Sequence, residues 1–159
     1  MLRDYRPEDA TDLNRVALAA FLQFQAAYAD WPAMALRVSQ MSKLSETAEV
    51  IVAIKDAALV GGVAYVPARA SKAPYFDPDW PIIRMLVVDP VARGHGIGRA
   101  LTEDCVARAR RDGASLIALH TTPIMNVALP MYLRMGFQRV RDAPPIYGVP
   151  YAVYGLRLT

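Results

Sequence analysis

Apolar and polar positions along the chain change from one periodicity to another near its middle. Residues 82 to 88 read IIRMLVV, an almost continuous apolar run that predicts a strand buried on both faces. From Gly98 to Arg111 apolar residues recur with helical spacing, and Asp112-Gly113 follows as a helix end. A loop with three alternating glycines joins this strand to this helix.

Similar patterns predict the remaining elements. We expect helices at about residues 7–24, 33–44 and 126–135, the last with a distorted or late first turn because it contains Pro130. We expect further strands at residues 1–5, 50–55, 59–66, 115–121, 137–140 and 151–158. The resulting order is β, α, α, β, β, β, α, β, α, β, β. It predicts a single α/β domain over residues 1–159, with one mixed sheet and helices on both faces.

Two proline-rich segments interrupt this pattern. Residues 143–150 are expected to form a loop between the last two strands. Residues 67–81 hold too many prolines for a central strand, yet they include Tyr75, Phe76 and Trp80. This second segment is either a substrate-facing loop or a packed surface loop.

Composition narrows the class of protein. With 159 residues, 54% hydrophobic and 21% charged, the chain is long and apolar enough for one ordinary core. No apolar run approaches the roughly 20 residues of a membrane helix, and no secretory signal pattern follows Met1, so we expect a soluble cytoplasmic protein. The net charge of +3 comes without a Lys/Arg run, which argues against nucleic-acid binding. Two histidines and the lone Cys105 give no metal cluster to propose.

The glycine-rich loop between strand and helix has a chemical purpose. Gly94, Gly96 and Gly98 permit positive φ and let a ligand approach the backbone closely. The helix that follows offers free N–H groups and a partial positive charge, to which Arg93 and Arg99 add full charges. Together they predict a phosphate or pyrophosphate site. A dinucleotide-binding fingerprint would need glycine in place of Arg99, and no Gly-Lys-Ser/Thr follows for a P-loop.

The sequence Arg93-x-x-Gly96-x-Gly98, directly after Val88-Asp89-Pro90, resembles the coenzyme A-binding motif of the GNAT superfamily of acyl-CoA N-acyltransferases. Ala128, Tyr132, Gly136 and Phe137 match a later A-x-x-x-Y-x-x-x-G-F segment of that family, and the resemblance covers nearly the whole chain.

The resemblance implies a fold and a cofactor site. The strands at residues 82–88 and 115–121 would be parallel and splay apart, with the pantetheine arm of acetyl-CoA between them as a substitute strand. The implied cofactor-binding residues are Leu86, Val87, Val88, Arg93, Gly94, His95, Gly96, Ile97, Gly98, Arg99, Ala100 and Asn126. The role of Asn126 is open, because family members carry asparagine where Met125 stands here. Asn126 either contacts the cofactor or is an N-cap or loop residue. GNAT proteins are often dimers, so the resemblance allows a homodimer, and the sequence leaves the oligomeric state open.

The implied activity is transfer of an acetyl group from acetyl-CoA to a primary amine of a small molecule or peptide. Tyr132 stands at the family's position for the acid that protonates the departing thiolate, although a tyrosine packed on its helix is the alternative. No carboxylate falls near residues 82–84, where some relatives have a glutamate base. His120, Asp77, Asp79 or a water chain remains for that role, and the alternative for His120 is a packed or hydrogen-bonded histidine at a strand end.

Two further alternatives stay open. In the family, the segment after the first helix folds over the acceptor site, so Tyr28 and Trp31 either line it or pack in the core. The whole chain, moreover, is either an acetyltransferase or an acyl-CoA-binding sensor that has lost turnover.

Overall fold

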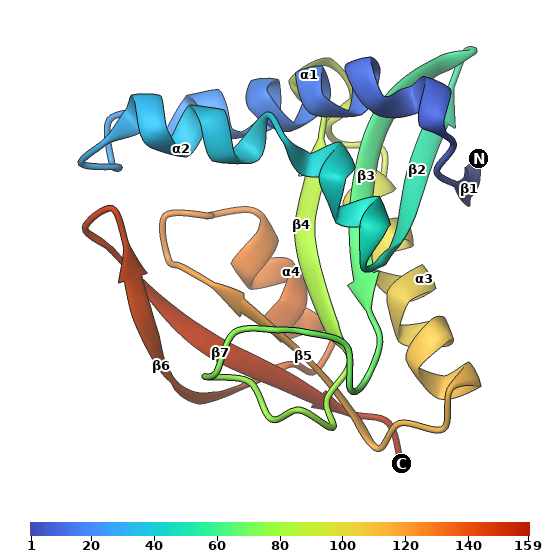
Figure 1. The fold of residues 1–159 in the computed structure, drawn as a ribbon, viewed down its shortest axis with the longest axis vertical. Helices are drawn as coiled ribbons and strands as arrows, with labels where there is room; N and C mark the ends of the chain where they lie inside the picture. The colour runs from blue at the N-terminus through green and yellow to red at the C-terminus, as the bar shows by residue number, and fades with distance from the viewer.

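The computed structural model describes residues 1–159 as one seven-stranded mixed sheet with helices on both faces (Figure 1). The strand order is β1-β2-β3-β4-β5-β7-β6. The strands are β1 (Leu2–Asp4), β2 (Glu49–Lys55), β3 (Ala58–Val66), β4 (Ile82–Val88), β5 (Leu116–Thr121), β6 (Gln138–Ile146) and β7 (Val149–Arg157). The helices are α1 (Ala10–Phe21), α2 (Trp31–Val38), α3 (Ile97–Arg111) and α4 (Ala128–Arg134), with 3-10 turns at Pro7–Asp9, Leu22–Phe24, Met41–Glu46 and Pro90–Ala92. The predicted α/β class and the predicted order of elements are therefore confirmed.

The sheet has a separate apolar core on each face. Alternate residues of β2 divide between them: Val50 and Val52 pack with α1 and α2, whereas Ile51 and Ala53 pack on the side of α3 and α4. This is the side-chain alternation of a strand that is covered on both faces. None of the helices is both long and apolar enough to cross a membrane.

Strands β4 and β5 are parallel, and they separate almost as soon as they meet. Their register contains a single pair, Ile82 with Ala118, so the rest of β4 has no strand partner on that side. On its other side β4 pairs with β3, but the register shifts between Gly62 and Ala64. Met85 lies in this irregular stretch with a positive φ of 58°. The expected splay is therefore present, and it leaves backbone groups of β4 free beside a gap.

The prediction of a loop over residues 143–150 is wrong. The strand β6 continues to Ile146, and a tight turn at Tyr147 and Gly148, with φ of 43° and 80°, leads directly into β7. β6 lies at the edge of the sheet and pairs only with β7, and prolines are found in such strands on the outward-facing side or at irregularities. Pro144 and Pro145 are therefore tolerated, at the cost of a shift in register between Ala143 and Ile146.

Two helices also differ in detail from the prediction. The helix expected at residues 33–44 is α2, which begins at Trp31 and stops at Val38, and a 3-10 turn then runs over Met41–Glu46. Helix α4 begins at Ala128, so Pro130 lies in its first turn, where its missing N–H removes no helical hydrogen bond.

Candidate active site

The loop between β4 and α3 has the backbone conformation that its glycines suggested. Gly94 and Gly96 have φ of 83° and 75°, and Gly96 is the left-handed N-cap of α3. A Cβ atom added to either residue would meet nothing within 4 Å. These glycines therefore serve the backbone conformation, and they leave the outer face of the loop open to a ligand.

The backbone of this loop presents a row of free donors. The N–H groups of residues 94 to 99 make no hydrogen bond to any backbone or side-chain acceptor of the protein. The His95 side chain folds back instead, with Nδ1 3.0 Å from the carbonyl oxygen of Arg93. Successive free N–H groups at the N-terminus of a fifteen-residue helix attract phosphate, because the helix dipole adds to their partial charges.

Two arginines lie beside these donors. Arg93 is exposed and has no carboxylate partner, and its guanidinium lies 3.4 Å from the carbonyl oxygen of Ala20. Arg99 donates to Glu103 over 2.7 Å on the exposed side of α3. Arg93 is therefore the freer of the two charges for a phosphate.

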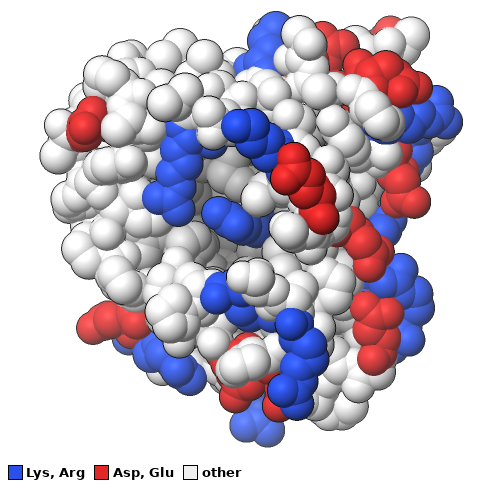
Figure 2. Space-filling model, in the orientation of Figure 1, with Lys and Arg blue, Asp and Glu red and all other residues white.

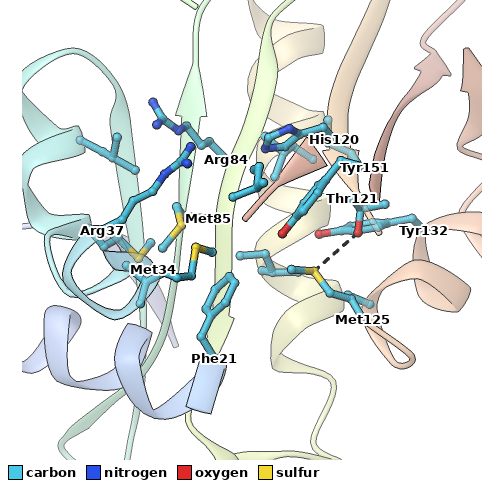
Figure 3. A pocket seen from close by; sticks show the side chains of 18 of the residues that line it. Phe21, Met34, Arg37, Arg84, Met85, His120, Thr121, Met125, Tyr132 and Tyr151 are labelled. Carbon is cyan, nitrogen blue, oxygen red and sulfur yellow. Dashed lines mark hydrogen bonds between the residues drawn. The ribbon is translucent and has the colours of Figure 1, made fainter. Parts of the chain in front are cut away.

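A cavity of about 120 Å³ opens next to the splay of β4 and β5. Figure 3 shows how side chains from both halves of the chain enclose it. The lining includes Phe21 from α1, Met34 and Arg37 from α2, Arg84, Met85 and Leu86 from β4, His120 from β5, Tyr132 from α4 and Tyr151 from β7. A second cavity of about 110 Å³ adjoins it, and Arg37, Ile83, Arg84 and His120 line both.

Tyr132 is buried in α4, with its hydroxyl directed into the first cavity (Figure 3). Its ring packs against Phe137 with centroids 5.6 Å apart, but its hydroxyl has no hydrogen-bond partner in the protein. Burial raises the pKa of Tyr132, so the phenol stays protonated at neutral pH. A protonated hydroxyl with a free hydrogen is suited to donate to an anion formed in this cavity.

His120 is held between aromatic rings at the end of β5. Its ring lies 5.5 Å from that of Tyr75 and 5.1 Å from that of Tyr151, and its Nδ1 is 3.0 Å from the Tyr75 hydroxyl. Burial, with smaller contributions from the charges of Arg37 and Arg84, lowers the pKa of His120 to about 4. The imidazole is therefore neutral at neutral pH but only weakly basic. It is packed and also reaches both cavities, so both sequence interpretations describe part of its environment.

Asn126 is exposed and lines neither cavity, and the N-cap of α4 is Val127 rather than Asn126. Met125 lines the first cavity instead, with its sulfur 3.6 Å from the Thr121 hydroxyl. The cofactor contact of Asn126 therefore stays a prediction from the resemblance alone.

The other candidates from the sequence lie further from the cavities. Asp77 and Asp79 are exposed and line neither one, and Asp79 pairs with Arg69 over 2.6 Å. Tyr28 is buried, with its hydroxyl bonded to that of Tyr151 and its ring packed against Trp31. Packing is thus the interpretation that fits Tyr28 and Trp31.

Arg37 and Arg84 are the lining residues that sequence reasoning missed. Each is the single charged residue of an apolar segment, WPAMALRV in α2 and IIRMLVV in β4. A single charge within an otherwise apolar segment was the sequence signal that could have identified both arginines. Arg84 was overlooked because the sequence analysis interpreted β4 as buried on both faces. In the structure Arg84 is exposed, and Met85 and Leu86 are half-buried where the cavity opens.

The model of the acetyltransferase (GNAT) family matches residues 14–137 of this chain. A mycothiol acetyltransferase of Cellulomonas flavigena is 34% identical over 121 residues, which cover 72% of this chain and 35% of that protein. The chain spans less than half the length of the curated relatives it matches. Among solved structures, a GCN5-related N-acetyltransferase from Rhodopseudomonas palustris has a TM-score of 0.75 at 21% identity, covering 99% of this chain and 95% of its own. A GNAT family acetyltransferase from Brucella melitensis in complex with acetyl-CoA has a TM-score of 0.66 at 24% identity, covering 100% and 88%. These two structures establish a shared fold.

Proposed function

Because the chain belongs to the acetyltransferase (GNAT) family, we propose that it transfers an acetyl group from acetyl-CoA to a primary amine of a small molecule or peptide. The observation that carries the proposal is the free hydroxyl of Tyr132, which reaches the cavity beside the splay of β4 and β5. A protonated hydroxyl in that position can act as an acid, and acyl transfer from a thioester produces a thiolate for it to protonate.

The cofactor would bind mainly through the backbone. The free N–H groups of residues 94 to 99 suit its pyrophosphate, with Arg93 beside them. The unpaired side of β4 near Leu86 and Val88 suits the pantetheine arm, which carries amide groups able to pair with a strand. The Brucella melitensis relative of the same fold is a complex with acetyl-CoA, which supports this choice of cosubstrate.

The chemistry would follow by direct attack. The neutral amine forms a bond to the thioester carbonyl carbon, and backbone N–H groups of β4 stabilise the oxyanion. The carbon–sulfur bond then breaks, and Tyr132 donates its proton to the departing thiolate, whose thiol has a pKa near 8.5 by analogy with cysteine. The resulting Tyr132 phenolate takes up a proton from water, which restores the phenol for the next turnover. The proton released by the amine goes to His120 or to water, since no carboxylate lines either cavity.

That absence of a strong base also favours a second candidate, an acyl-CoA-binding sensor without turnover. One experiment separates the two functions: the protein is incubated with acetyl-CoA and a broad panel of small-molecule and peptide amines while thiol release is followed, and acetyl-CoA binding is measured by calorimetry. An acetyltransferase releases thiol in an amine-dependent way. Tight binding without release for any amine would identify the sensor instead.

A further inference from the structure

Arg37 and Arg84 form a pair of like charges at the junction of the two cavities. Arg37 comes from α2 and Arg84 from β4, and both line both cavities. Arg84 pairs in register with Ala64, which belongs to the core on the α1 and α2 face, so it lies on the same face as Arg37. Figure 3 shows the two guanidinium groups turned toward the same space.

Nothing in the protein neutralises this pair. Neither arginine makes an ion pair or a hydrogen bond, and no Asp or Glu lines either cavity. Arg108, by contrast, is neutralised within the chain, because it forms ion pairs with the carboxylates of Asp4, Glu49 and Asp104. Figure 2 shows Lys and Arg side chains around a hollow on this face, with the acidic side chains at its rim or further out.

The two charges also act on each other and on their surroundings. Arg84 is exposed over part of its surface, but partial desolvation still lowers its pKa, and the charge of Arg37 acts in the same direction. Burial lowers the pKa of His120 as well, and both arginines add to that effect. Two cations held close together without a counterion are unfavourable in the free protein, and a bound anion would relieve their repulsion.

We propose that the amine acceptor carries an acid group, a carboxylate or a phosphate, which binds between Arg37 and Arg84. The inference rests on the proposed function and names its substrate class. The planar guanidinium group matches such oxyanions with paired N–H donors. With its acid group held at the junction, the acceptor extends its amine into the cavity that Tyr132 lines.

The test compares matched substrates. Primary amines that carry a carboxylate are assayed beside their carboxamides, and primary amines that carry a phosphate monoester beside the corresponding alcohols. We expect kcat/KM to be roughly tenfold to a hundredfold higher for the acids, the range set by one or two hydrogen bonds to a charged group. The carboxylate and phosphate arms show which acid group the site prefers.

Variants connect this preference to the arginines. Arg37→Gln and Arg84→Gln should raise KM for the acids and remove most of the roughly tenfold to hundredfold ratio in kcat/KM between each acid and its neutral counterpart, each ratio being measured within one variant. The matched control is Arg110→Gln, which removes the same charge from an exposed position on α3 that has no ion pair. Circular dichroism establishes that each variant is folded.

The outcomes separate this inference from the proposed function. Turnover with equal kcat/KM for acids and neutral counterparts would overturn the inference and leave the acetyltransferase intact. If no amine is acetylated, calorimetric binding of the same acids to the protein–coenzyme A complex decides. Binding that Arg84→Gln abolishes and Arg110→Gln retains supports the anion site without the activity, and no such binding overturns the site.

Discussion

The coenzyme loop (residues 93–100) follows β4, and β4 also lines the acceptor cavity (the first cavity, with Arg37, Arg84, His120 and Tyr132), but the two sites are built differently. The loop is one contiguous segment whose useful groups are backbone N–H donors. The cavity combines side chains from α2, β4, β5 and α4, which are far apart in the sequence. A backbone site depends on chain conformation and open space, whereas a side-chain site depends on the identity of each residue.

This difference also separates a site that most side chains hardly affect from a site that its side chains define. A loop of backbone donors recognises a phosphate whatever most of its side chains are. A cavity whose only charged lining residues are arginines selects for the charge of the molecule it holds. The loop therefore predicts the cofactor, and the cavity predicts the class of acceptor.

The largest expected effect comes from filling the open face of the coenzyme loop. Gly96→Glu places a side chain and a negative charge on that open face, where the pyrophosphate would bind, and Gly98→Glu places its Cβ within 4 Å of Val88, Leu86 and Met131, beside the same free N–H groups. Two or three charge-assisted hydrogen bonds are then lost, so acetyl-CoA affinity measured by calorimetry should fall by roughly 10³-fold or more. Gly113→Glu is the matched control, because Gly113 also has a positive φ, 74°, and open space around it, but follows the other end of α3.

The two positive-φ variants, Gly96→Glu and Gly113→Glu, should each lose roughly 1–2 kcal/mol of stability from left-handed backbone strain. Only the variants in the loop should lose affinity. Normal acetyl-CoA affinity in folded Gly96→Glu and Gly98→Glu would show that the cofactor binds elsewhere.

The next largest effect concerns the hydroxyl of Tyr132, which lines the acceptor cavity. Tyr132→Phe removes one oxygen and little volume, so acetyl-CoA should bind as before while kcat falls by roughly 10²–10⁴, the contribution of a positioned acid. Tyr65→Phe is the control: the Tyr65 hydroxyl donates to Asp112 over 2.8 Å and lines neither cavity. An unchanged kcat in Tyr132→Phe, with chemistry rate-limiting, would make Tyr132 a packing residue only.

The smallest effect is expected from the remaining candidates for the base. The depressed pKa of His120, about 4, leaves the imidazole neutral throughout pH 5–8, so its titration cannot produce an acidic limb in that range. We expect His120→Asn, Asp77→Asn and Asp79→Asn to retain turnover, with an acidic limb in kcat/KM that reflects protonation of the amine itself. Loss of about three orders of magnitude in one variant that still binds acetyl-CoA would identify that residue as the base.

The same contrast explains how much the sequence could predict. The strand at residues 82–88, the glycine loop and the helix after it were located almost to the residue, because strand, turn and helix signals there are all local. Tyr132 was found because its neighbours on α4 form a recognisable pattern.

The remainder depended on tertiary contacts. Whether Pro144 and Pro145 could lie in a strand depended on β6 being at the sheet edge, and sheet order is not local information. Arg37 and Arg84 are 47 positions apart in the chain, so nothing in the sequence showed that they meet. Asp77 and Asp79 were plausible bases only until their positions away from both cavities were known.

The central claim is that backbone N–H groups of the coenzyme loop bind acetyl-CoA. Amide hydrogen exchange with and without acetyl-CoA tests this claim most directly, because it measures the protection of each N–H group separately. Acetyl-CoA should slow exchange at residues 94 to 99, whose N–H groups now lack partners, and at β4 near Leu86 and Val88. Helix α2, which supplies Arg37, should change little until an acceptor is added. Protection that develops elsewhere while residues 94 to 99 exchange as fast as before would contradict the account.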